Sequence, residues 1–167
     1  MNSEHVIRRS RRRLLASQQD VRAAVVEVTG VASRTLSIFT HDLEPQIYAH
    51  DDFLEAVKRF VLSRSFTRVR VLIGDPQRAI KISHRFVAMG RRLNSYIEFR
   101  HRNPELGACP EAYLIADDTG LVFRADATRW EGLSDTFEPA VARKYLSRFD
   151  ELWAACEPSP EIRELRV

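Results

Sequence analysis

Three side chains in the second half of the chain have types and spacing that could do chemistry together. Glu111, Tyr113 and Asp118 follow the pattern E-x-Y-x-x-x-x-D. A carboxylate can act as a general acid, a general base or a nucleophile, and a phenol can donate a proton. Residues two apart in a strand point to the same face of a sheet, so Glu111 and Tyr113 are expected to project together. Asp118 falls in a turn, where its expected role is to bond the turn backbone.

A β-hairpin is predicted to carry these residues. Residues 109–124 read C-P-E-A-Y-L-I-A-D-D-T-G-L-V-F-R, with an alternating run from Ala112 to Ala116. An Asp-Asp-Thr-Gly turn follows, and then a second strand from Leu121 to Arg124.

The rest of the chain alternates strands and helices. Strands are predicted at residues 35–40, 68–73 and 96–100, and a loop at residues 126–137. Four helices are predicted. The first follows a cap at Ser17, and the second begins at Asp51. The third follows a cap at Asp75 and has an apolar stripe that runs to Leu93, and the fourth begins at Pro139. This order predicts an α/β fold with a mixed, mostly parallel sheet and helices on both faces.

A second group of polar residues lies where the predicted parallel strands end. Ligands bind open α/β sheets beyond these carboxyl ends. The ligand-binding candidates are His41, Asp42, Asp75, His101 and Arg102. If the first hairpin strand runs antiparallel to the others, its start reaches the same edge. Such edges are polar in most α/β domains, so ordinary loop polarity is the alternative interpretation.

Motifs for metals and cofactors are missing from the sequence. There is no H-x-x-x-H, C-x-x-C, G-x-G-x-x-G or G-x-x-x-x-G-K-[ST]. We therefore predict no metal site and no cofactor. His50 and His84 are expected at the surface.

Composition predicts one globular domain, with 44% hydrophobic and 29% charged residues among 167. The net charge of +3 comes from the beginning of the chain. Five of the 26 basic residues gather there with one of the 23 acidic ones, which leaves 21 basic and 22 acidic residues elsewhere. These five are Arg8, Arg9, Arg11, Arg12 and Arg13. We predict a basic arm at 1–16, a domain at 17–156 and a polar tail at 157–167.

Nothing in the sequence predicts a membrane protein or a secreted one. No run approaches the roughly 18 apolar residues that span a bilayer, and the first residues lack the apolar core of a signal peptide. Two cysteines, Cys109 and Cys156, suit a reduced compartment better than a disulfide framework. The expected location is the cytoplasm.

The order of elements resembles one half of a phospholipase D-like unit, from about Val21 to Trp153. The hairpin and the closing stretch K-Y-L-S-R-F-D-E-L-W carry this resemblance. The superfamily has H-x-K-x-x-x-x-D at the same strand and turn, and here only Asp118 matches it. More specifically, the chain resembles an uncharacterised bacterial group with a degenerate form of this fold. The resemblance implies a homodimer and, by analogy with that group, an acetyltransferase-type protein partner.

The resemblance also implies that the superfamily's chemistry is lost. In its enzymes one histidine attacks phosphorus, a second protonates the leaving oxygen, and lysines hold the phosphate. Glu111 in place of histidine would face an anionic substrate with a like charge, which costs on the order of a few kcal/mol at an effective dielectric near 20. Tyr113 in place of lysine removes the offsetting cation. The superfamily's G-S-x-N is matched only by R-A-D-A at residues 124–127.

Three functional hypotheses follow. The leading one is a non-catalytic phospholipase D-like domain that acts as a binding or regulatory module. A nucleic-acid-binding protein that uses the arginine-rich arm is the second. The third is an enzyme with altered acid/base chemistry, in which Glu111 works with His41 or His101.

Overall fold

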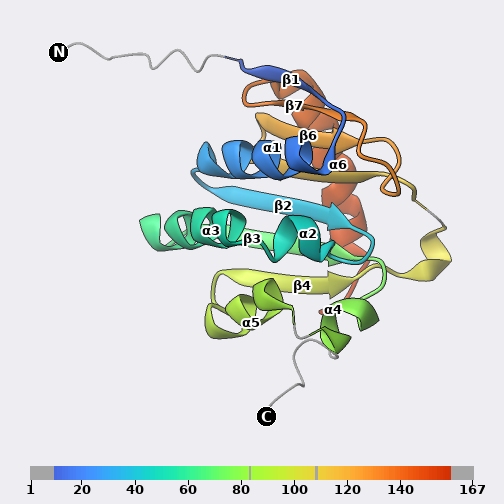
Figure 1. The fold of residues 1–167 in the computed structure, drawn as a ribbon. Helices are drawn as coiled ribbons and strands as arrows, with labels where there is room; N and C mark the ends of the chain where they lie inside the picture. The colour runs from blue at the N-terminus through green and yellow to red at the C-terminus, as the bar shows by residue number, and fades with distance from the viewer. Residues whose placement is uncertain (1–9, 83, 108, 159–167) are drawn as a thin grey trace.

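A seven-stranded mixed sheet runs through the molecule in the order β1-β7-β6-β5-β2-β3-β4 (Figure 1). The computed structural model describes residues 10–82, 84–107 and 109–158. The strands are β1 (Arg12–Leu15), β2 (Thr35–Thr40), β3 (Arg68–Ile73), β4 (Ile97–His101), β5 (Ala112–Ala116), β6 (Gly120–Arg124) and β7 (Gly132–Asp135).

Parallel pairing joins β2 to β3 and β3 to β4, as expected from the two helical crossovers. The hairpin strand β5 pairs antiparallel with β2 on one side and with β6 on the other. β7 and β1 continue the sheet with antiparallel pairing. The predicted mixed α/β sheet is confirmed, with a larger antiparallel part than the sequence indicated.

Helices cover both faces of the sheet. They are α1 (Gln18–Gly30), α2 (Pro45–Tyr48), α3 (Asp51–Ser63), α4 (Gln77–Lys81), α5 (Arg85–Arg92) and α6 (Pro139–Ala154). A short 3-10 turn spans Pro104–Leu106. α1, α3 and α5 lie on one face, and α6 crosses the other alone (Figure 1). In the part of the chain that the structure describes, no helix is both long enough and apolar enough to cross a membrane.

The period-two pattern of the strands divides the core into two layers. In β2, Ile38 faces α1 and α3, while the next residue, Phe39, faces α6. β3 repeats this division, with Val71 on the first side and Leu72 on the second. The layer under α6 also receives Phe149 from the helix itself. The alternation therefore fixes which side chains of β5 can reach α6.

Helix starts follow the predicted signals. The Ser17 hydroxyl accepts a hydrogen bond from the Asp20 amide at 3.1 Å, which caps α1. Asp51 opens α3 and Pro139 opens α6, both as predicted. Asp75 accepts from the Gln77 amide at 3.0 Å, but the N-cap of α4 is Pro76 rather than the predicted Asp75.

Two strands were missed in the sequence. Arg12–Leu15, placed in the arm, form the edge strand β1, and Gly132–Asp135, placed in a loop, form β7. Each has four residues and few apolar ones, so the local pattern is weak and pairing with a neighbour decides the conformation. The basic segment is therefore partly built into the sheet.

The predicted third helix is two helices. α4 ends at Lys81, and α5 begins at Arg85 after a new N-cap at His84. His84 is buried, contrary to its expected surface position, and Ile82, expected in the buried stripe, is 48% exposed. Val141 of α6 is exposed as well. The short helix α2 was not predicted.

Candidate functional site

The hairpin places the start of β5 beside the carboxyl end of β2, as the sequence analysis expected. Tyr113 lies opposite Phe39 in the β2–β5 register. Glu111 is two residues earlier, immediately before β5 begins. Glu111 and Tyr113 therefore lie at the edge of the sheet where open α/β folds bind ligands.

Tyr113 is a core residue of the layer under α6. It is 3% exposed, and its ring stacks on Phe39 with centroids 5.0 Å apart and an interplanar angle of 7°. Tyr145 of α6 packs against it at 5.5 Å between centroids. Burial raises the pKa of the Tyr113 phenol. The phenol is neutral at physiological pH and supplies no cation for a phosphate.

Glu111 has a charged partner that the sequence did not reveal. Arg148 of α6 places its Nη1 3.7 Å from Glu111 Oε1. The Cys109 thiol donates a long hydrogen bond to the same carboxylate at 3.9 Å. The side chain of Glu111 is about one-fifth exposed. From the sequence, the negative charge of Glu111 was expected to repel an anionic substrate. That expectation needs correction, because the guanidinium of Arg148 in α6 compensates this charge.

The turn of the hairpin contains two aspartates with different roles. Asp117, rather than Asp118, bonds the backbone: its carboxylate accepts from the amides of Ser33, Arg34 and Thr35 at 2.7–3.2 Å. These bonds tie the turn to the start of β2. Asp118 forms a surface ion pair with Arg143 Nε at 3.0 Å.

Three of the ligand-binding candidates meet at Gly74. His101 Nε2 is 3.0 Å from the Gly74 carbonyl oxygen, and the Asp75 amide donates to the His41 carbonyl at 2.6 Å. A Cβ at Gly74 would lie 3.0 Å from His41 Nδ1. The close approach of these strand ends therefore requires glycine.

The other two candidates point elsewhere. Asp42 pairs with Arg78 of α4 at 2.6 Å. The Arg102 guanidinium lies over Phe39, 5.6 Å from the ring centroid, and so approaches the Tyr113 stack. The described partners of Glu111 do not include His41 or His101. No group of three metal-ligating side chains occurs in the described ranges.

Sequence reasoning missed a buried ion pair next to this edge. Arg124, the last residue of β6, pairs with Glu44, which precedes α2. Both are nearly inaccessible, with side chains 4% and 13% exposed. Arg124 also donates to the carbonyls of Ala127 and Arg129 and lies 5.1 Å from the Trp130 ring centroid. Eighty residues separate Arg124 from its partner, so no local spacing predicts the pair.

The loop before α2 is held by several elements. Leu43 has a positive φ of 56°, and its amide donates to the Thr40 hydroxyl at 3.1 Å. His84 Nε2 donates to the Leu43 carbonyl at 2.8 Å, while its Nδ1 accepts from the Phe86 amide. Burial lowers the pKa of His84. A neutral imidazole thus fixes this loop to the start of α5.

Solved structures of other proteins show which fold this chain has, and a family model shows which family it belongs to. Nuc of Salmonella typhimurium, a phospholipase D family member, has a TM-score of 0.62 at 14% identity, over 90% of this chain and 99% of its own. NucT from Helicobacter pylori gives 0.59 at 15% identity, over 90% of this chain and 100% of its own. These likenesses establish a phospholipase D-like fold. The chain belongs to the family described as a domain of unknown function, DUF7931, which matches residues 17–165.

A third structure with this fold has a different described role. TrmBL2, described as an archaeal chromatin protein with a novel mode of DNA binding, has a TM-score of 0.63 at 15% identity. The match covers 95% of this chain and only 56% of the TrmBL2 chain. No curated protein matches the sequence.

Proposed function

We propose that this protein is a non-catalytic phospholipase D-like domain that acts as a binding or regulatory module. The observation that carries the proposal is the burial of Tyr113, whose ring stacks on Phe39 where the superfamily has its phosphate-binding lysine. A neutral, buried phenol cannot clamp a phosphate. Arg148 engages the carboxylate of Glu111, which stands where the nucleophilic histidine belongs.

The proposal is tested by looking for phosphodiester hydrolysis. The full chain is incubated with an aryl phosphodiester, with phosphatidylcholine vesicles and with DNA, and an enzyme known to hydrolyse each substrate serves as the positive control. We expect no product above buffer with any substrate. Product formation that scales with protein concentration would overturn the proposal.

The acid/base alternative is tested with the same assays. It requires Glu111 and a histidine to share a proton, whereas the histidines lie at Gly74 and the carboxylate lies by Arg148. We expect Glu111→Gln to change no rate. A pH-dependent activity that disappears in this variant would establish the alternative.

A second candidate function is nucleic-acid binding through the basic arm. The described chromatin role of TrmBL2 supports it. Arg11, just before the edge strand β1, and Arg12, its first residue, are both exposed and support it as well. Arg13 is less available because it pairs with Glu27 at 3.1 Å. Arg8 and Arg9 lie outside the described residues.

The arm is tested by replacing Arg8, Arg9, Arg11 and Arg12 with alanine in the full chain. Affinity for labelled duplex DNA is measured across a salt series, because each lost phosphate contact reduces the slope of log K against log salt by about 0.9. We expect a shallower slope in the variant. Identical affinities and slopes would exclude the arm as a binding element.

The proposal includes a homodimer, an acetyltransferase-type protein partner and a cytoplasmic location, which all remain predictions. The dimer is supported by family resemblance and by the match to the whole Nuc chain. Light scattering at micromolar concentration tests it, and a mass of 19.3 kDa throughout would exclude a dimer.

A further inference from the structure

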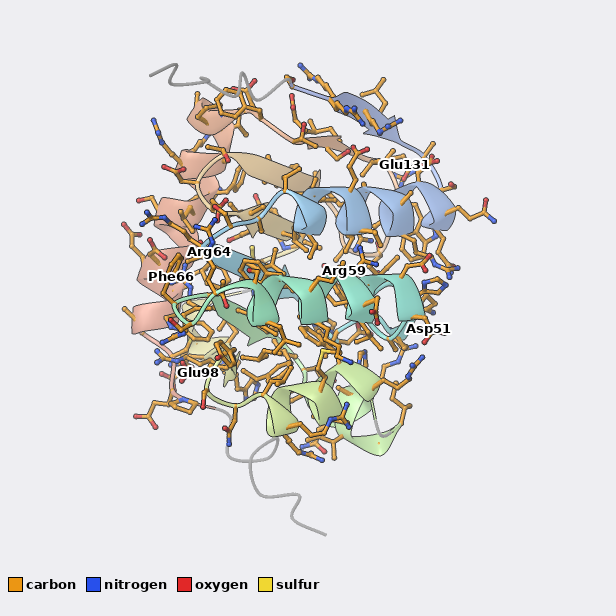
Figure 2. The ribbon with its side chains drawn as sticks, turned by 90° about the vertical axis from the view of Figure 1, so that its left-hand side faces the viewer. Asp51, Arg59, Arg64, Phe66, Glu98 and Glu131 are labelled. Carbon is orange, nitrogen blue, oxygen red and sulfur yellow. The ribbon has the colours of Figure 1, made fainter. Side chains whose placement is uncertain are left out.

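Phe66 lies in the turn between α3 and β3, and 49% of it is exposed. This turn is at the edge where the parallel strands β2, β3 and β4 begin, opposite the edge that holds Glu111. Figure 2 shows Phe66 and Arg64 together beyond the end of α3, far from Asp51 at the start of that helix. A single exposed aromatic ring is ordinary, so its surroundings decide whether it is informative.

Arginines surround this ring. The guanidinium groups of Arg34 and Arg64 each lie 5.8 Å from its centroid. Arg68, the first residue of β3, lies 5.9 Å from the centroid of Tyr96, which is partly buried. Within the described ranges, no salt bridge pairs any of these three arginines with a carboxylate, and we call the five residues the Phe66 surface. Three uncompensated cations on one edge favour an anionic ligand.

The turn holds its shape without burying Phe66. The Thr67 hydroxyl is fully buried and donates to the carbonyls of Val61 and Arg64, both at 3.0 Å. The Ser63 hydroxyl donates to the Phe60 carbonyl at 2.6 Å. Arg68 adds bonds to two carbonyls of the turn. The ring is therefore presented on a preorganised backbone, which lowers the entropy cost of binding.

We propose that the Phe66 surface binds single-stranded nucleic acid. A base would stack on the exposed part of the Phe66 ring, and the arginines whose guanidinium groups lie over the two rings would contact the phosphates on either side of that base. A duplex is disfavoured because its bases are already stacked and present no free π-face to the ring. This inference goes beyond the proposed function and does not depend on it, since the two sites lie at opposite edges of the sheet.

The test is fluorescence anisotropy with a labelled 20-nucleotide oligothymidylate and the full chain. Phe66→Ala should weaken binding about five- to one-hundredfold, the range expected for the loss of one stacked base. The double variant Arg34→Ala/Arg64→Ala should reduce the slope of log K against log salt by about 1.4. Ile82→Ala is the control for an exposed apolar residue, at 48% exposure, and Arg78→Ala/Arg85→Ala is the control for charge. Neither control should change the affinity.

Two further measurements distinguish a single strand from the other anionic ligands. The anisotropy is repeated with a duplex of the same length, and sedimentation is measured with phosphatidylserine vesicles. Preference for the single strand with loss in Phe66→Ala supports the proposal. Equal binding by wild type and Phe66→Ala would overturn it, as would binding to vesicles alone. Circular dichroism melting checks that each variant folds.

Discussion

At the scale of single residues, Tyr113 is the position on which the proposed loss of phosphodiester chemistry depends. Its side chain occupies the layer under α6 and contacts both a strand and a helix. Restoring the superfamily's lysine there would place an ammonium group in an apolar environment. The side chain at this position therefore serves packing, and a charged residue there would cost stability.

Replacing Tyr113 with lysine should lower the free energy of unfolding by about 3 kcal/mol or more, because a buried cation without a partner is costly. Tyr113→Phe keeps the stacking on Phe39 and should cost no more than about 1 kcal/mol. Urea unfolding of the two variants measures both values. Equal stabilities would mean that the ring is not buried as described.

His84 should make stability depend on pH. Burial lowers its pKa in the folded protein below the ordinary 6.5, although its bond to Leu43 and the nearby Asp42 oppose part of this effect. The unfolded chain therefore binds a proton at pH values where the folded protein does not. The free energy of unfolding should fall as the pH decreases from about 6.5 toward the lowered pKa.

The contribution of His84 is isolated with His84→Asn, whose amide oxygen can still accept from the Phe86 amide. Urea unfolding between pH 5 and pH 7 should show a smaller loss of stability on acidification in the variant than in wild type. The same slope in both proteins would exclude His84 as the titrating group.

At the scale of elements, the hairpin is joined to the rest of the sheet through its turn. Asp117 accepts three backbone amides at the start of β2, and the neighbouring Asp118 pairs with Arg143 at the surface. Asp117→Ala leaves those amides unsatisfied and should cost about 2–4 kcal/mol. Asp118→Ala, the matched control, should cost about 1 kcal/mol or less. Thermal melting compares them, and equal losses would contradict these roles.

The buried ion pair between Glu44 and Arg124 should matter more than its counterpart on the surface. Glu44→Gln leaves the Arg124 guanidinium without its counter-charge in a nearly inaccessible place, which should cost about 3–5 kcal/mol. Glu131→Gln breaks the exposed pair with Arg129 and should cost about 1 kcal/mol or less. Chemical unfolding measures both. A small loss in Glu44→Gln would mean that water reaches the pair.

The C-terminal half of α6 is fixed by arginines from the sheet. Arg100 of β4 lies 4.3 Å from the Trp153 ring centroid and donates to the carbonyls of Trp153 and Cys156. Arg70 of β3 pairs with Asp150 at 2.8 Å and lies over Phe149. These contacts position α6, which in turn brings Tyr145 and Arg148 to the hairpin.

At the scale of the whole molecule, the sequence predicted what depends on local pattern. Period-two alternation and helix caps located β2, β3, β4, the hairpin and most helix starts. β1 and β7 were missed because strands of four residues with few apolar side chains are formed by pairing rather than by composition. The third helix was predicted as continuous because its apolar spacing persists across the break. There His84 caps a new helix by accepting from the Phe86 amide, and its other ring nitrogen bonds to the distant Leu43 carbonyl.

The candidate site was predicted in outline and not in its charges. Topology alone brings the start of β5 to the end of β2, so the position of Glu111 followed from the expected fold. The pairing with Arg148 did not follow, because it depends on the angle at which α6 crosses the sheet. Glu44 and Arg124 are likewise joined only by the tertiary fold.

The central claim is that the phospholipase D-like fold is retained here without its phosphodiester chemistry. The most direct measurement is the initial rate of hydrolysis of an aryl phosphodiester by wild type, divided by the rate for Glu111→Gln prepared identically. We predict that the wild-type and variant rates both equal the buffer rate, so the ratio of the uncorrected rates is one. A wild-type rate well above buffer that falls tenfold or more in the variant would contradict it.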